Sequence, residues 1–171
     1  MGQGLCEWGL RGVEALRDRV AALVIVDVLS FSTAVDVALA SGALVIPFSL
    51  SDRATARVAA AAAGAVLAKP REAGGADFSL SPPSLVGIPR GTRLLLPSPN
   101  GSRLSLAGGA VPVFTGCLRN AEAVAAAVRA VAGDGAVGVV PAGELWGDAA
   151  EPKARVHIDL WESYLQPAEK T

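Results

Sequence analysis

The feature that most constrains the fold is an almost unbroken apolar run over residues 21–28, which only Asp27 interrupts. A strand that is apolar at every position, rather than at alternate positions, is typical of the buried centre of a parallel sheet. A helical pattern follows over residues 32–40 and stops at Gly42, which completes a strand-helix unit. The chain is therefore expected to build a parallel sheet with helices on both faces.

The same alternation of strand and helix continues along the chain. Further strands are expected over residues 43–48, 65–68, 93–96, 111–114 and 136–140, and further helices over residues 13–19, 51–63 and 120–131, with a short helix after residues 98–102. This rhythm predicts an α/β fold, a three-layer α/β/α sandwich around a mostly parallel central sheet, with a mixed sheet left open. A single domain is expected over residues 1–148. The alternation stops near Ala149, so residues 149–171 are expected to form a separate tail, with disorder of the tail left open.

Composition excludes several classes of function. The 171 residues carry 15 Lys and Arg against 16 Asp and Glu, for a net charge of -1, so nothing favours nucleic-acid binding. The longest apolar stretch is too short to span a membrane, and charged residues interrupt the N-terminus where a signal peptide would lie. A cytoplasmic location without membrane contact is therefore expected. A single His and two Cys without metal-ligand spacing argue against a zinc site and against Ser-His-Asp catalysis.

Polar residues follow four of the expected strands, and the carboxyl ends of parallel strands meet at one edge of a sheet, where ligands bind. This edge is expected to hold Asp27, Ser30, Ser32, Thr33, Ser98, Asn100, Gly101, Ser102, Thr115, Gly116, Cys117, Arg119, Asn120 and Glu144. Asp27 ends a very apolar strand, so its carboxylate needs a cation, a metal ion or several N–H donors. We interpret it as a Mg²⁺ ligand or general base, the alternative being a carboxylate satisfied by backbone amides at a helix N-terminus.

The other candidates suggest an anion site. Asn100, Gly101 and Ser102 are expected to form a nest of N–H groups in which Gly101 adopts a left-handed conformation, the alternative being a plain turn. Arg119 is expected to bind an anion with its guanidinium group. Cys117 is either a nucleophile or a small buried side chain. The nucleotide-binding motifs G-x-x-x-x-G-K-[ST] and G-x-G-x-x-G are absent from the sequence.

Four segments in order carry a resemblance to a known family: VIVDVLSFSTAVDVALASGA, LPSPNGSRL, GCLRNAEAVA and PAGELW, with CEWGLRGVEAL and FSLSPPSL in addition. Together they resemble the 2-phosphosulfolactate phosphatase (ComB-like) family over about residues 5–147. The tail from Ala149 resembles nothing in that family, so the chain is similar to a C-terminally truncated or divergent member.

The resemblance implies a three-layer α/β/α fold and Mg²⁺-dependent hydrolysis of a small phosphorylated acid such as 2-phosphosulfolactate, an intermediate of coenzyme M biosynthesis. The family's strand-end Asp falls on Asp27, its Asn-Gly-hydroxyl turn on Asn100 to Ser102, and its strand-end Asn on Asn120. The expected roles are then as follows: Asp27 and Arg119 catalytic; Asp27 and Glu144 metal ligands; Ser30, Ser32, Asn100, Gly101, Ser102, Cys117 and Asn120 substrate-binding. A non-catalytic small-anion binding module and an inactive fragment remain alternatives, and homo-oligomer formation is left open.

Overall fold

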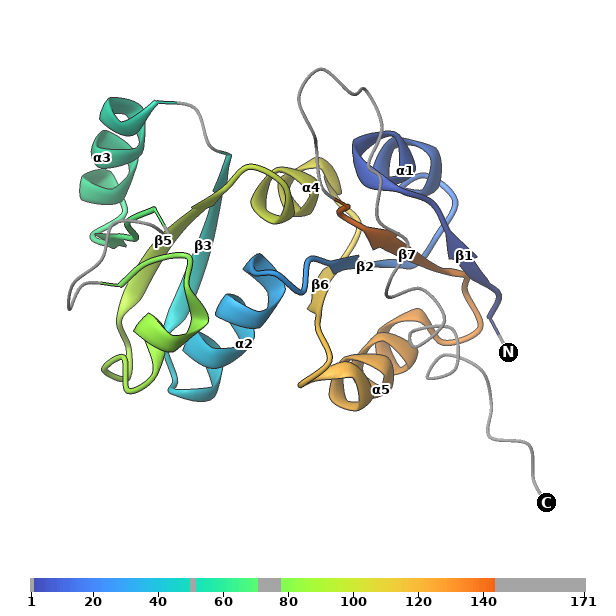
Figure 1. Ribbon diagram of the computed structural model, residues 1–171. Helices are drawn as coiled ribbons and strands as arrows, with labels where there is room; N and C mark the ends of the chain where they lie inside the picture. The colour runs from blue at the N-terminus through green and yellow to red at the C-terminus, as the bar shows by residue number, and fades with distance from the viewer. Residues whose placement is uncertain (1, 50–51, 71–77, 144–171) are drawn as a thin grey trace.

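The computed structural model describes residues 2–49, 52–70 and 78–143 of the chain (Figure 1). Their strands form two sheets in which every pairing is parallel, with the strand orders β1-β7-β2-β6 and β3-β5-β4. The predicted α/β class with parallel strands is confirmed. The expected single central sheet is wrong, because the strands are divided between two sheets.

The four-stranded sheet consists of β1 (Gly4–Cys6), β7 (Val137–Pro141), β2 (Ala22–Val26) and β6 (Val113–Gly116). Every residue of its two inner strands, β7 and β2, is buried, as the continuous apolar run predicts. The helices α1 (Gly9–Leu16) and α4 (Gly101–Ala107) cover one face, and α5 (Ala121–Ala132) covers the other.

The three-stranded sheet consists of β3 (Leu44–Ser49), β5 (Arg93–Ser98) and β4 (Val66–Leu67). On one face lie α2 (Phe31–Ala40) and the 3₁₀-helix η2 (Pro82–Leu85), and on the other lies α3 (Arg53–Ala62). Each sheet is therefore a three-layer α/β/α unit. β3 lies at the edge of its sheet, a position that suits Pro47, since proline has no N–H to donate to a second neighbouring strand.

Two helices carry the chain between the sheets. The chain leaves β2 through α2 to reach β3, and it returns from β5 through α4 to reach β6. Figure 1 shows α2 and α4 lying between the two sheets. Because both helices begin at the carboxyl end of a strand, this arrangement brings the ends of β2 and β5 close together although they belong to different sheets.

The ends of two helices differ from those expected from the sequence. α1 begins at Gly9, because its buried face combines Gly9 and Gly12 with Val13 and Leu16, and glycines add nothing to an apolar pattern. Asp52 caps α3 by accepting a hydrogen bond from the Thr55 N–H, at 2.8 Å, whereas Ser51, the first residue of the expected helix over residues 51–63, lies outside the described residues. The tail expected over residues 149–171 lies outside them as well.

Candidate active site

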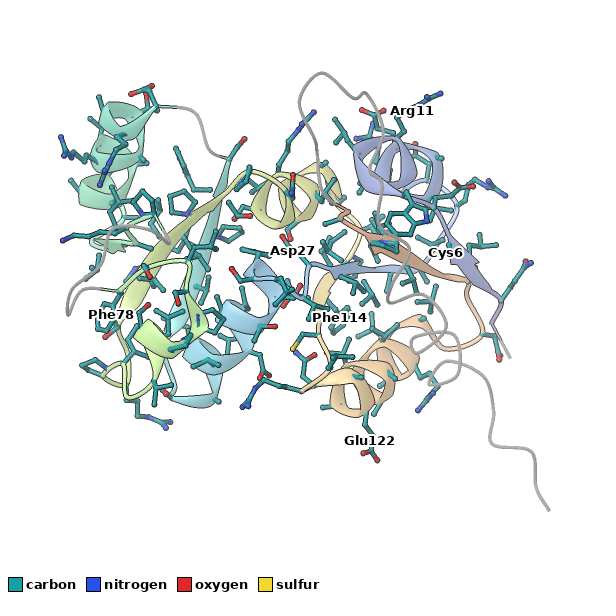
Figure 2. The ribbon with its side chains drawn as sticks, in the orientation of Figure 1. Cys6, Arg11, Asp27, Phe78, Phe114 and Glu122 are labelled. Carbon is teal, nitrogen blue, oxygen red and sulfur yellow. The ribbon has the colours of Figure 1, made fainter. Side chains whose placement is uncertain are left out.

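Asp27 directly follows β2, at the carboxyl end of that strand. Figure 2 labels it near the middle of the molecule. Its side chain is half-buried, and its Oδ2 accepts a hydrogen bond from the Gly101 N–H, at 3.0 Å. Gly101 is the first residue of α4, so the carboxylate lies at the positive end of that helix. The alternative interpretation of Asp27, a carboxylate bound by a backbone amide at a helix N-terminus, is thus realised for one of its oxygens.

The expected nest around Gly101 is wrong. Gly101 does not have a positive φ, and its N–H is taken by Asp27 rather than turned toward a free anion. Glycine is required there for a different reason: a Cβ at this position would lie 2.2 Å from Cδ1 of Phe31. The first turn of α4 can reach Asp27 only because residue 101 has no side chain.

Asn100 connects the same point to β7. It is the N-cap of α4, and its Nδ2 donates to the Gly143 carbonyl, at 3.4 Å. Gly143 lies just beyond β7, whose neighbour Ala142 donates its N–H to the Val26 carbonyl, at 2.9 Å. The ends of β2 and β7 and the start of α4 therefore meet around Asp27 and Asn100. The sequence did not identify Gly143 or Phe31, although Gly143 lies in the short segment after the expected strand over residues 136–140.

Ser30 and Ser32 use their side chains within the protein. The buried Ser32 Oγ accepts the Asp27 N–H and donates to the Ile25 carbonyl, both at 3.1 Å. The buried Ser30 Oγ donates to the Leu80 carbonyl, at 2.8 Å. Both hydroxyls therefore hold the loop between β2 and α2, and Ser30 links it to the segment before η2.

Ser102, Asn120 and Cys117 are similarly engaged. The Ser102 hydroxyl is fully buried and donates to the Leu96 carbonyl, at 2.7 Å. Asn120 is the N-cap of α5, but its Oδ1 accepts the Cys117 N–H, at 2.8 Å, and its Nδ2 donates to the Thr115 carbonyl, at 3.1 Å. Cys117 is fully buried, which agrees with the expected alternative of a small buried side chain. In this conformation these side chains close their own strand-helix turns.

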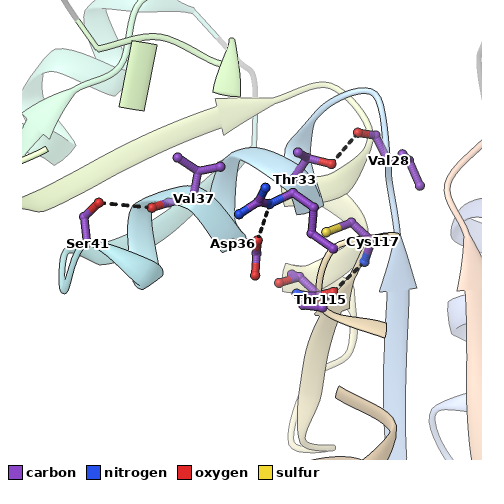
Figure 3. A network of polar contacts seen from close by, with 9 residues as sticks. Val28, Thr33, Asp36, Val37, Ser41, Thr115 and Cys117 are labelled. Atoms are coloured by element: carbon purple, nitrogen blue, oxygen red, sulfur yellow. Dashed lines mark hydrogen bonds and ion pairs between the residues drawn. The ribbon is translucent and has the colours of Figure 1, made fainter. Parts of the chain in front are cut away.

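Arg119 is directed to α2. Its Nε lies 2.9 Å from Asp36 Oδ2, and the two side chains are 60% and 19% exposed. Figure 3 labels Asp36 of this pair and Thr33, both on α2, and the Thr33 hydroxyl donates to the Val28 carbonyl, at 2.7 Å. The ion pair ties the β6–α5 turn to the crossover helix α2. Of the expected site residues, the structure brings together Asp27, Asn100 and Gly101, whereas Arg119 is paired elsewhere and Glu144 lies outside the described residues.

The chemistry of this edge fits a hard cation. Mg²⁺ is commonly held by one or two carboxylates, while water and substrate phosphate complete its octahedron. Asp27 supplies one carboxylate beside the amide of Asn100 and the carbonyl of Gly143. Within residues 2–49, 52–70 and 78–143, no three His, Cys, Asp or Glu side chains gather as a metal-binding group. Asp27 therefore suits a cation whose remaining ligands come mostly from substrate and water.

The comparison with known families decides the relationship. A family model described as 2-phosphosulpholactate phosphatase matches residues 12–150. The chain belongs to this family. Its members are phosphoric monoester hydrolases, and the match includes every candidate site residue from Asp27 to Glu144. A search of curated proteins finds no match for the chain. In the part of the chain that the structure describes, no helix has the length and apolarity needed to cross a membrane.

Proposed function

We propose that the chain is a Mg²⁺-dependent phosphatase that hydrolyses a small phosphorylated acid of the 2-phosphosulfolactate type. The observation that supports this most is the place of Asp27 within the family match: a carboxylate at the carboxyl end of a central strand, held by the first N–H of α4. Glu144, expected as a second metal ligand, belongs to the same proposal. So do the cytoplasmic location and the place in coenzyme M biosynthesis.

The protein's part in the reaction is to fix a carboxylate at the reacting edge. Asp27 cannot swing away freely, because Gly101 binds its Oδ2 and the Ser32 hydroxyl binds its backbone N–H. When bound, Mg²⁺ supplies Lewis-acid polarisation of the phosphoryl group. Asp27 would hold the cation, and the fixed geometry means that the charge is in place before the substrate arrives.

Hydrolysis then requires little covalent chemistry from the protein. Water attacks phosphorus, the bond between phosphorus and the ester oxygen breaks, and the products are inorganic phosphate and the hydroxy acid. The proton lost by water passes to the leaving oxygen or to solvent. The residues around Asp27 contribute mainly by position and electrostatics, which are usually the largest contributions in phosphoryl transfer.

The test is release of inorganic phosphate from 2-phosphosulfolactate by the whole chain, with Mg²⁺ and with EDTA. We expect release that depends on Mg²⁺ and that exceeds release from a phosphate ester of a neutral alcohol. Binding of the substrate without any release, measured by calorimetry with Mg²⁺ present, would instead support a small-anion binding module. Absence of both release and binding would contradict the proposal.

A further inference from the structure

Asn100 lies between the two elements that frame the site. Its chain neighbour Gly101 donates to Asp27 Oδ2, at 3.0 Å, and its own Nδ2 donates to the Gly143 carbonyl, at 3.4 Å. Asn100 is therefore adjacent to the carboxylate along the chain and bound to the end of β7 through its side chain.

The hydrogen bond to Gly143 fixes which way the amide group is turned. A backbone carbonyl can only accept, so the NH₂ group of Asn100 must face Gly143 and the Oδ1 atom must face away from it. An N-cap asparagine ordinarily uses that oxygen to accept an N–H of the first helical turn. Asn100 makes no such capping bond, and within the described part of the chain its Oδ1 accepts no hydrogen bond.

An unused amide oxygen on the residue next to Gly101, whose N–H binds the Asp27 carboxylate, favours a cation over an anion. Phosphoryl oxygens are acceptors and would be repelled by Oδ1, whereas amide and carboxylate oxygens are both ligands for hard divalent cations. The positive end of α4 disfavours a cation, but Asp27 already covers the first N–H of that helix and supplies a full negative charge.

We propose that Asn100 Oδ1 is a second protein ligand of the divalent cation held by Asp27, and that the Gly143 carbonyl is the group that positions it. This assignment rests on the cation site of the proposed function, and it replaces the sequence-based role of Asn100 in binding substrate. It also gives a reason for the direction of this side chain, which is turned to β7 instead of to its own helix.

The assignment can be tested without catalysis by titrating the whole chain with Mn²⁺ and following free Mn²⁺ by electron paramagnetic resonance, with no substrate present. Asn100→Ala should raise the Kd for Mn²⁺ at least about tenfold, as loss of an interaction at a metal site typically does. Asn100→Asp should keep or lower the Kd, because it retains an oxygen and adds charge. Asn120→Ala is the matched control. The Asn120 side chain is hydrogen-bonded to the Cys117 N–H and the Thr115 carbonyl, so its removal should not change the Kd.

Thermal melts establish that each variant is folded, and Asn100→Asp keeps the test decisive if Asn100→Ala unfolds. An unchanged Kd in Asn100→Ala, a raised Kd in Asn100→Asp, or an equal rise in Asn120→Ala would overturn the assignment. Absence of Mn²⁺ binding to the parent chain would overturn it as well. Mn²⁺ binding that depends on Asn100 without release of phosphate would contradict only the proposed function.

Discussion

Phe31 packs against Gly101 so closely that a Cβ on residue 101 would lie 2.2 Å from the Cδ1 atom of the ring. Phe31 is the first residue of α2 and Gly101 the first residue of α4, so the contact joins the starts of the two helices that connect the sheets. Asp27 accepts the Gly101 N–H at the same place. The geometry of the candidate site therefore depends on the apolar contact between Phe31 and Gly101.

Gly101→Ala should destabilise the fold by about 1–3 kcal/mol, because a methyl group must displace Phe31 or the helix start. Urea unfolding would measure the change in the free energy of unfolding. Gly4→Ala is the control, since a Cβ there meets nothing within 4 Å and Gly4 has no positive φ.

If the loss comes from overlap with the ring, a smaller side chain at position 31 should relieve part of it. The double variant Gly101→Ala with Phe31→Leu should then be more stable than the sum of the two single changes predicts. Strictly additive losses would show that the Phe31 contact is not the cause.

Ser32→Ala should destabilise the chain by about 1–3 kcal/mol, because it leaves the Asp27 N–H in a largely buried place without its acceptor. The same measurement on Ser41→Ala should show a smaller effect, because the Ser41 hydroxyl makes one long bond of 3.4 Å to the Val37 carbonyl. Equal losses in the two variants would contradict the role given to Ser32 in holding the loop.

Asp52 makes the N-terminus of α3 sensitive to acid. The hydrogen bond from the Thr55 hydroxyl, followed by that from the Thr55 N–H, lowers the pKa of Asp52 from its ordinary value of 3.8. Because the pKa is lower in the folded state, the stabilisation is complete above pH 3.8 and is lost as the pH falls through the folded pKa. NMR titration of the Asp52 carboxyl carbon should give a midpoint below 3.8, moving upward in Thr55→Ala; no movement would contradict this cause.

The ion pair of Arg119 and Asp36 should contribute little to stability. Since the Arg119 side chain is 60% exposed, a double-mutant cycle of Arg119→Gln and Asp36→Asn should give a coupling of less than about 1 kcal/mol. The coupling should fall further in high salt. A large coupling that is insensitive to salt would mean that the pair is a structural clamp rather than a surface contact.

The expected catalytic role of Arg119 remains a prediction, and loss of phosphate release in Arg119→Gln would support it.

The sequence predicted the parts of the fold that follow from local pattern. The run before Asp27 indicated an inner strand, and β2 is one; Gly42 was expected to end a helix, and it has a positive φ just after α2. The division into two sheets could not be predicted this way, because the choice of strand partner is made over long distances in the chain. Pro47 was a local signal for an edge strand that the pattern of apolar residues concealed.

The candidate site, like the fold, could be predicted only in part from local sequence pattern. The strand-end position of Asp27 was visible in the sequence, but the fate of nearby hydroxyl and amide groups was not. Ser32, Ser102 and Asn120 bind backbone groups of their own turns, a use that competes with ligand binding and has the same sequence signal. The role of Gly101 was wrong for a related reason: glycine suits both a positive φ and a close approach, and only the position of Phe31 distinguishes them.

The central claim is that Asp27 makes this edge a phosphatase site, and Asp27→Asn tests it most directly. The amide oxygen that this substitution introduces can still accept the Gly101 N–H, so the fold should be retained while the negative charge is lost. The measurement is the rate of phosphate release from 2-phosphosulfolactate at saturating Mg²⁺, beside a thermal melt of the same sample. The account predicts a rate at least about 100-fold below that of the parent, with a native melt. A folded Asp27→Asn variant that releases phosphate at the parent rate would contradict it.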